Sequence, residues 1–371
     1  MIDRVVQRQI EQRLYKGKAI ILLGPRQVGK STLVEALTQG KDVVFMTGDD
    51  ADDRKLLTDA SVAGLKSILG KKTILYIEEA QRMPDIGVTI KLITDHIKSV
   101  QVIATGSSSF DLANHTNEPL TGRKYEFLLF PLSFGEMVAH HGLLEEKRKL
   151  GHRIVYGYYP EIVTKQGEEK ELLLLLANSY LYKDLLMLEQ LKKPQLLEKL
   201  VRALALQVGS EVSFNELGRT VGTDNKTVEK YIDLLEKAFV IFKLPAFSRN
   251  VRNEIKKGRK IYFYDCGIRN AVLKDFRPFD IRPDKGALWE NFVIAERMKF
   301  IHYNGLSVKQ YFWRTTQQQE IDLVEEGETM SAFEIKTSES AKAKYPLTFS
   351  NNYPNAAYQQ IHMGNLESVL L

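Results

Sequence analysis

One stretch of this sequence has the pattern of a phosphate-binding loop. Residues 24–31 read Gly-Pro-Arg-Gln-Val-Gly-Lys-Ser, which fits G-x-x-x-x-G-K-[ST]. An apolar run at residues 19–23 predicts a buried strand before the loop, and residues 32–37 predict an amphipathic helix after it. Glycines let backbone N–H groups curl around a polyphosphate, and a helix start adds partial positive charge. A chance match in a glycine-bearing loop is the alternative, and the flanking strand and helix argue against it.

We therefore expect a nucleotide site at this loop. Lys30 would reach the β- and γ-phosphates, and the Ser31 hydroxyl would take a Mg²⁺ position. ATP and Mg²⁺ are the expected cofactors. The predicted nucleotide-binding residues are Gly24, Pro25, Arg26, Gln27, Val28, Gly29, Lys30, Ser31 and Thr32.

Composition limits the class of protein. A chain of 371 residues suggests two to four units, and 44% hydrophobic with 27% charged residues is typical of a folded globular protein. The net charge of +5 permits a nucleic-acid partner without requiring one. Cys266 is the single cysteine, so no internal disulfide is expected and a reducing cytoplasm fits. We expect no signal peptide after Met1-Ile2-Asp3-Arg4 and no membrane partner, since the leucine run at residues 172–176 is too short to span a bilayer.

Element order predicts an α/β fold. Strand-like runs alternate with helical ones up to about residue 140, and such βαβ units imply a parallel sheet covered on both faces. The stretch at residues 144–207 is mostly helical in pattern and predicts a lid or connector. The expected strands of the first unit are residues 19–23, 43–46, 73–77, 101–105 and 125–130.

Polar residues follow two further strands of this sheet. The strand at residues 73–77 ends in Glu78-Glu79, and carboxylates at the carboxyl edge of a parallel sheet suit magnesium and water in a P-loop enzyme. Glu78 is the expected Mg²⁺ support and Glu79 the residue that orients or deprotonates the attacking water. The strand at residues 101–105 runs into Gly106-Ser107-Ser108-Ser109, whose hydroxyls would sense the γ-phosphate or hold water. Solvated strand-capping acids and ordinary turn-forming serines remain the alternatives.

The series of motifs resembles a known family. Four further motifs follow the glycine loop along the chain. They are Glu78-Glu79-Ala80-Gln81, Thr105-Gly106-Ser107-Ser108, Leu120-Thr121-Gly122-Arg123 and Pro131-Leu132-Ser133-Phe134-Gly135-Glu136. Together they are similar to the prokaryotic AAA-type ATP-binding proteins that carry a C-terminal domain catalogued as one of unknown function. The resemblance implies an AAA-type ATPase core in which residues 101–107 are the sensor-1 strand, with Thr105 among the catalytic residues.

This chain departs from the family pattern at one position, and the resemblance also indicates a role for one arginine. The family usually has aspartate where this chain has Glu78, which bears on the rate of hydrolysis. Arg123 is a candidate γ-phosphate sensor or a finger acting in trans, which would require a homo-oligomer. A surface arginine in a glycine turn is the alternative.

The middle of the chain has helix-turn-helix spacing. Ser213 and Glu216 predict a capped helix, Gly222 a turn, and Thr223-Asp224 the cap of a second helix at residues 226–239. Two strand-like runs follow, at residues 240–244 and 260–264. Basic residues join them, which predicts a winged helix whose wing contacts DNA phosphates; a solvated hairpin is the alternative. The basic residues are Arg249, Arg252, Lys256, Lys257, Arg259 and Lys260.

The C-terminal region carries acids and a lysine in a nuclease-like order. Glu290 lies in a helical segment, Asp322 on one strand, and Glu334 with Lys336 on the next, an arrangement typical of restriction-endonuclease-like sites. Alternate residues of a strand share a face, so Glu334 and Lys336 point the same way. Asp322 and Glu334 would share a Mg²⁺ while Lys336 positions water or stabilises charge. The family resemblance implies the same fold, and a charged sheet face is the alternative.

These observations give four predicted segments and three functions. The segments are an AAA-type core at 1–143, a helical connector at 144–207, a winged helix at 208–275 and a restriction-endonuclease-like domain at 276–371. The first function is a Mg²⁺-dependent ATPase acting on or near DNA with a C-terminal nuclease. The second is an ATP-dependent switch or remodeller whose C-terminal half only binds partners. The third is a small-molecule kinase, which so large a C-terminal half disfavours.

Overall fold

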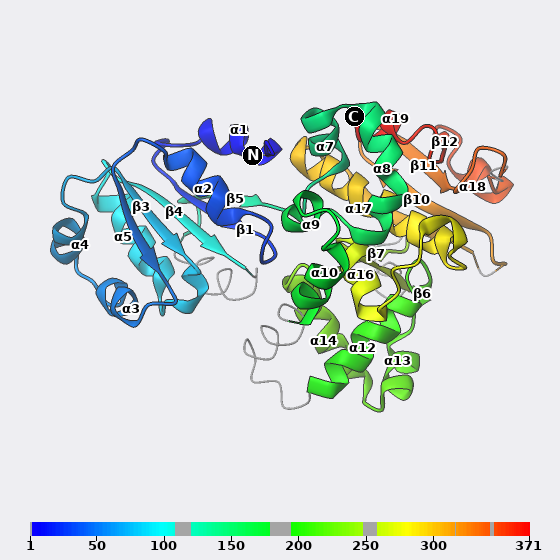
Figure 1. Ribbon diagram of the computed structural model, residues 1–371, viewed down its shortest axis with the longest axis horizontal. Helices are drawn as coiled ribbons and strands as arrows, with labels where there is room; N and C mark the ends of the chain where they lie inside the picture. The colour runs from blue at the N-terminus through cyan, green and yellow to red at the C-terminus, as the bar shows by residue number, and fades with distance from the viewer. Residues whose placement is uncertain (1, 108–119, 179–193, 248–257, 316, 342–344) are drawn as a thin grey trace. The chain divides into compact units, whose positions relative to one another are not determined.

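The computed structural model describes residues 2–107, 120–178, 194–247, 258–315, 317–341 and 345–371. These residues form two compact units, one of residues 1–131 and one that takes in most of residues 132–371 (Figure 1). Among the described helices, none combines the length and the apolar character needed to cross a bilayer.

The first unit is built on a five-stranded parallel sheet in the order β2-β3-β4-β1-β5. Strands β1 and β4 are buried along their whole length, as expected for apolar strands covered on both faces. Helix α2 packs on β3 and β4, and α5 packs on β4. The predicted α/β class and all five predicted strands are confirmed. The elements are α1 (Val5–Glu11), β1 (Ala19–Leu23), α2 (Lys30–Thr38), β2 (Val43–Thr47), α3 (Ala51–Leu57), α4 (Val62–Leu69), β3 (Ile74–Glu78), η1 (Ala80–Arg82), α5 (Ile86–His96), β4 (Gln101–Gly106) and β5 (Lys124–Leu128).

The second unit begins with helices and a small sheet. Strands β6, β8 and β7 form an antiparallel sheet in that order, and the helices α13 and α14 precede β7 in the chain. The predicted cap is present, since the Ser213 hydroxyl accepts from the Glu216 N–H at 3.3 Å. The elements are α7 (Phe134–His141), α8 (Leu143–Tyr156), α9 (Pro160–Thr164), α10 (Glu169–Ala177), α12 (Pro194–Leu206), β6 (Glu211–Val212), α13 (Phe214–Val221), α14 (Asn225–Lys237), β7 (Ile241–Pro245), β8 (Arg259–Phe263), α16 (Cys266–Leu273) and η3 (Phe279–Ile281).

The rest of the second unit is a four-stranded mixed sheet with a long helix. Strands β9, β10 and β11 are antiparallel neighbours, and β12 joins β11 in parallel. Helix α17 packs on β8 and β11 and so lies against both sheets of this unit. The elements are α17 (Lys285–Tyr303), β9 (Lys309–Arg314), β10 (Glu320–Glu326), β11 (Met330–Ile335), α18 (Leu347–Asn352), β12 (Ala357–Ile361) and α19 (Glu367–Leu370).

The boundary between the units lies earlier than the predicted residue 143. Residues 132–143 belong to the second unit, where the Phe134 N–H donates to the Glu296 carboxylate of α17 at 2.7 Å. Phe134 is fully buried there. The sequence shows no composition shift at residue 132, so the position of this boundary depends on packing. The finer division at residues 207 and 275 stays a prediction.

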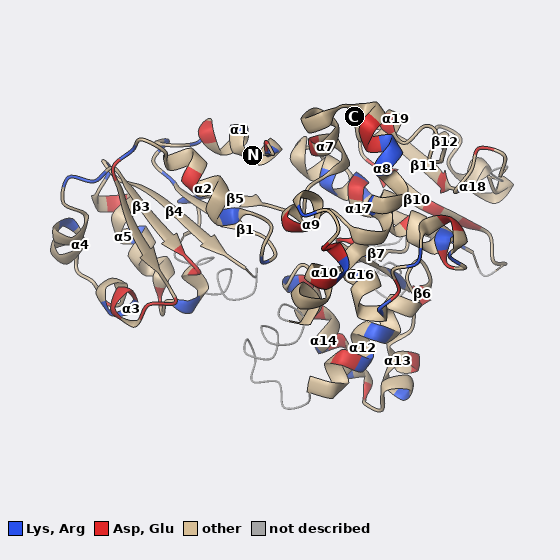
Figure 2. Ribbon diagram, viewed as in Figure 1, with Lys and Arg blue, Asp and Glu red and all other residues tan. Residues whose placement is uncertain are grey.

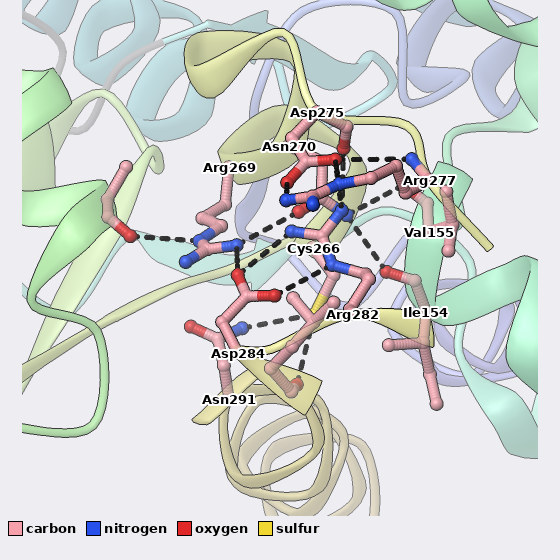
Figure 3. Close-up of polar contacts among 12 residues, drawn as sticks. Ile154, Val155, Cys266, Arg269, Asn270, Asp275, Arg277, Arg282, Asp284 and Asn291 are labelled. Atoms are coloured by element: carbon pink, nitrogen blue, oxygen red, sulfur yellow. Dashed lines mark hydrogen bonds and ion pairs between the residues drawn. The ribbon is translucent and has the colours of Figure 1, made fainter. Parts of the chain in front are cut away.

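A buried ionic network ties the second unit together (Figure 3). The Asp284 carboxylate accepts from Arg269 Nη1 at 2.5 Å and from Arg282 Nε and Nη2, both at 2.9 Å. Arg269 also donates to the Ala205 carbonyl of α12, and Asn270 donates to the Ile154 and Val155 carbonyls of α8. The network therefore joins α8, α12, α16 and the start of α17.

Asp284→Ala is expected to destabilise the protein by about 3 kcal/mol, because both guanidinium groups are buried and would lose their shared carboxylate. Burial alone would raise the pKa of Asp284, but hydrogen bonds from the two arginines lower it overall. Urea denaturation at pH 7 measures the change. Asp280→Ala, at an exposed acid nearby, should stay within about 0.5 kcal/mol of the wild type. An equal loss in both variants would contradict the role of the network.

Candidate functional site

The predicted phosphate loop joins β1 to α2 at the carboxyl edge of the parallel sheet. A Cβ on Gly24 would lie 2.1 Å from the Leu129 carbonyl oxygen, so glycine is required there. Gly29 has a φ of 91° and caps α2 without a side chain. The first N–H groups of α2 therefore have no side-chain cap and suit an anion.

Lys30 lies inside the loop. Its ammonium donates to the carbonyls of Gly24 at 2.8 Å and Pro25 at 2.7 Å, and the side chain is buried. Burial lowers the pKa of Lys30 to about 8, although the nearby Glu79 carboxylate opposes this shift. The lysine is therefore mostly charged at pH 7, as a phosphate contact requires.

The rest of the loop is held by a residue that no sequence motif indicates. The Arg4 guanidinium donates to the Val28 carbonyl and to the Phe130 carbonyl, both at 2.7 Å. Val28 is fully buried and Gln27 has a φ of 59°, so the loop is tightly folded between Gly24 and Gly29. Arg4 lies far from the loop in sequence, which is why sequence reasoning misses it.

Ser31 and Glu78, the two predicted Mg²⁺ residues, are in contact. The Ser31 hydroxyl donates to the Glu78 carboxylate at the end of β3, and the Tyr76 hydroxyl donates to the same oxygen at 3.3 Å. Thr105, buried in β4, hydrogen-bonds to Tyr76, whose pKa is raised to about 12, mainly by burial. A hydroxyl beside a carboxylate offers the oxygen ligands that Mg²⁺ takes. Glu78 stands where the similar family usually has aspartate, and its longer side chain still contacts the Ser31 hydroxyl.

Glu79 is held by two neighbours. Its carboxylate accepts from the Gln81 amide at 2.6 Å and from the Ser107 hydroxyl at 3.2 Å, and the same amide donates to Ser107 at 3.0 Å. Glu79 has a φ of 47°, an uncommon conformation for a residue other than glycine and a mark of local strain. The predicted role of Ser107 at the γ-phosphate or the attacking water stays a prediction, and the sequence alone assigns no role to Gln81. Ser108 and Ser109 lie outside the described residues.

Arg123 lies at the other edge of the sheet. It precedes β5, and its carbonyl accepts from the N–H of Ala19 at the start of β1. The length of β1 therefore separates it from the loop, about 16 Å for five residues. The guanidinium donates to Asp95 at 2.8 Å and lowers the pKa of that acid. The prediction that Arg123 contacts the γ-phosphate of its own chain is therefore wrong. A role of Arg123 in trans stays a prediction.

Three of the four predicted nuclease-like residues come together in the second unit. Lys336 lies 2.8 Å from a Glu334 carboxylate oxygen and 3.6 Å from one of Asp322, and Asp322 accepts the Ile335 N–H at 2.8 Å. The pKa of Glu334 is raised by burial and by the Asp322 charge. We name Asp322, Glu334 and Lys336 the acid–lysine cluster. Asp322 lies on β10, Glu334 on β11, and Lys336 directly follows β11.

Glu290 has different partners. Its carboxylate accepts from the Lys260 ammonium at 3.0 Å and from the Tyr262 hydroxyl at 2.6 Å, both from β8. Burial raises the pKa of Glu290 to about 7, with the Lys260 charge opposing and the Asp322 charge adding to the shift.

The prediction that Lys260 belongs to an exposed basic wing is wrong. It is 1% exposed and pairs with Glu320 at 2.6 Å as well as with Glu290, so it has no access to DNA phosphates. The pKa of Lys260 is raised, because these carboxylates outweigh burial. Sequence alone gives Lys260 the same appearance as the other basic residues around it. Arg249, Arg252, Lys256 and Lys257 lie outside the described residues.

The donor groups present set limits on metal binding. In the described ranges no three or more His, Cys, Asp or Glu side chains gather as a metal-binding group. A Mg²⁺ at either predicted place would therefore rest on one or two side chains with water and substrate oxygens, which is how Mg²⁺ is often held beside phosphates.

Family models match three successive parts of the chain. Residues 16–138 match the family model described as an AAA domain, and residues 147–278 and 285–366 match two described as domains of unknown function (DUF8612 and DUF4143). An uncharacterized protein of Mycobacterium tuberculosis is 27% identical over 337 residues, which are 88% of this chain and 72% of that protein. One of Methanocaldococcus jannaschii is 24% identical over 300 residues, 69% of this chain and 63% of its own.

A solved structure has a similar fold. The Walker-type ATPase of Pyrococcus abyssi aligns with a TM-score of 0.51 at 14% identity, over 74% of this chain and 96% of that one. At this identity the likeness concerns the fold alone. The match to the AAA domain model, together with the strand order and the glycine loop, supports an AAA-type ATP-binding domain at residues 16–138.

Proposed function

We propose that this protein is a Mg²⁺-dependent ATPase. The observation that carries the proposal is the meeting of Lys30, the Ser31–Glu78 pair and Glu79 at one edge of the parallel sheet. Ligands of open α/β sheets bind at this edge. A lysine in a glycine loop, a hydroxyl with a carboxylate and a second, separately held carboxylate are the groups that ATP hydrolysis needs.

Each group has a distinct task. Lys30 would exchange its two carbonyl partners for phosphate oxygens, and Ser31 with Glu78 would hold a hydrated Mg²⁺, which offsets phosphate charge. Glu79 would accept a proton from the attacking water or orient it. Gln81 and Ser107 would keep the Glu79 carboxylate in place.

The test is phosphate release from ATP by the full chain with Mg²⁺ and with EDTA. We expect turnover only with Mg²⁺ and without any added phosphate acceptor, which distinguishes hydrolysis from the transfer catalysed by a small-molecule kinase. Absence of turnover, or turnover that needs an acceptor, would contradict the proposal.

We propose a second activity, cleavage of nucleic acid, at the acid–lysine cluster. The specific observation is that Lys336 contacts carboxylates from two strands, Asp322 and Glu334. Asp322 and Glu334 would support a Mg²⁺, and Lys336 would position water or stabilise the charge that develops on phosphate. The helix-turn-helix of α13 and α14 with the strands β7 and β8 fits a winged helix that brings nucleic acid to this unit. The alternative is a switch whose second unit binds partners without cleavage.

Asp322→Asn and Lys336→Ala are each expected to lower Mg²⁺-dependent cleavage of plasmid DNA at least 100-fold, by the order of effect that follows loss of an electrostatic group, while ATP hydrolysis is kept. The side-chain oxygen of the Asp322→Asn variant still accepts a hydrogen bond from the Ile335 N–H, so the sheet should persist. Glu326→Gln, at an exposed acid that ends β10, is the matched control and should cleave normally. Wild-type protein that binds DNA but never cuts it would favour the switch.

A further inference from the structure

A polar groove in the second unit has no role in the proposed chemistry. Its volume is about 860 Å³, within the range of ligand sites. It is lined by β6, by the start of α13, by Asn225 and Glu229 of α14 and by the neighbouring ends of β8 and β9. We infer that this groove holds a single strand of nucleic acid and leads it to the acid–lysine cluster. The inference rests on the proposed action of this unit on nucleic acid.

Two arginines supply cationic contacts in the groove. Arg259 lies with its guanidinium carbon 4.4 Å from the centre of the Phe214 ring, so an arginine and an aromatic face share one wall. Arg314 is partly exposed and donates to Gln318, and its two ion pairs are long, at 3.8 Å to Glu211 and 3.9 Å to Glu320. Five N–H donors in a planar fork suit phosphate oxygens, and stacked arginine–aromatic walls suit bases.

The remaining wall suits the same ligand. Ser213, Phe214 and Asn215 begin α13, and the cap of this helix is the neutral Ser213 hydroxyl. The start of this helix carries partial positive charge, which the Glu216 carboxylate in the first turn offsets in part. Asn225 and Gln318 add amide groups, which donate to and accept from base edges.

Arg314 links the groove to the charged residues of the sheet. Arg314 on β9 is the ladder partner of Glu320 on β10, two residues before Asp322. Glu320 is paired in turn with the buried Lys260. A strand that contacts Arg314 would thus run along β9 towards the β10 residue that the proposed cleavage uses.

Two acids also line the groove, and their loss should affect nucleic-acid binding in the opposite direction to loss of the arginines. Glu211 and Glu229 oppose a polyanion, and Glu229 is exposed. Figure 2 shows that helices α12 and α13 carry both signs of charge, so no single basic face stands out on these helices. Binding that depends on the groove should therefore respond in opposite directions to loss of its arginines and loss of its glutamate.

The experiment is fluorescence anisotropy of a labelled 20-mer of deoxythymidine with the full chain, in EDTA and without ATP, at several salt concentrations. Arg259→Gln and Arg314→Gln are each expected to weaken binding about 5- to 20-fold and to reduce the salt slope by about one charge. Glu229→Gln should tighten binding about 2- to 4-fold, because it removes one repulsive charge. Arg219→Gln, on an exposed part of α13 outside the groove lining, is the matched control and should change little.

Each outcome decides a separate claim. Arg219→Gln as harmful as the groove variants, or groove variants that bind like the wild type, would place the contact on another surface and overturn the inference. No binding by the wild type at low salt would overturn both the groove and the proposed action on nucleic acid. Groove-dependent binding without any later cleavage in Mg²⁺ would support the groove and contradict only the nuclease. Circular dichroism of each variant confirms that the fold is kept.

Discussion

Glu79→Gln is expected to lower ATP turnover about 10²- to 10³-fold while ATP binding stays within about threefold of the wild type. Glutamine keeps the size of the side chain and an oxygen that accepts from Gln81 and Ser107, so the local structure should persist. What it loses is the negative charge that accepts a proton from water. Steady-state phosphate release and binding of a fluorescent ATP analogue measure the two quantities separately.

Two controls define the result for Glu79. Glu35→Gln changes an exposed acid on α2 and should leave turnover unaltered. Gln81→Ala removes a partner of the carboxylate while the carboxylate itself remains, so an intermediate loss of about tenfold is expected, the equivalent of about one hydrogen bond. Turnover of Glu79→Gln at the wild-type rate would show that the base lies elsewhere.

Lys30→Ala is expected to weaken ATP binding about 10- to 100-fold and to abolish measurable turnover. The change removes a buried ammonium whose charge-assisted hydrogen bonds are worth about 1.5–3 kcal/mol each. Removal of the charge also leaves the phosphates without the loop's own lysine as a counter-charge. Isothermal titration with ATP and Mg²⁺ gives the affinity directly.

Lys30→Arg tests geometry against charge. The planar fork of an arginine does not fit between the carbonyls of Gly24 and Pro25, so we expect little rescue of turnover. Lys66→Ala, at an exposed lysine of α4, is the matched control for a lost positive charge. Normal ATP affinity in Lys30→Ala would contradict the assignment of the loop.

Local pattern is enough to predict the sheet of the first unit. Five apolar runs separated by helical stretches predict five strands, and each is a strand of the parallel sheet. The loop and the Glu78-Glu79 pair follow directly from strand ends, because parallel strands bring their carboxyl ends to one edge. The acid–lysine cluster can be predicted in the same way, from alternation along β10 and β11.

Long-range partners cannot be predicted in this way. Arg4 reaches a carbonyl 24 residues away, and Lys260 pairs with Glu290, 30 residues on. Pairs of this kind depend on how separate elements pack, and one sequence holds no periodic signal for them. The same reason explains why the sequence pattern places Lys260 in an exposed wing although it is buried.

The amino-acid order alone was sufficient to predict which groups lie at the ends of strands, namely a glycine loop with Lys30 and Ser31 and the acids Glu78 and Glu79. These residues are close in sequence to the elements that carry them, so local rules were enough. The folded chain was needed to place Arg123 at the opposite edge of the sheet and to bring Arg259 and Arg314 into one groove. The physical reason is that packing energy and buried charge pairing are properties of the assembled elements.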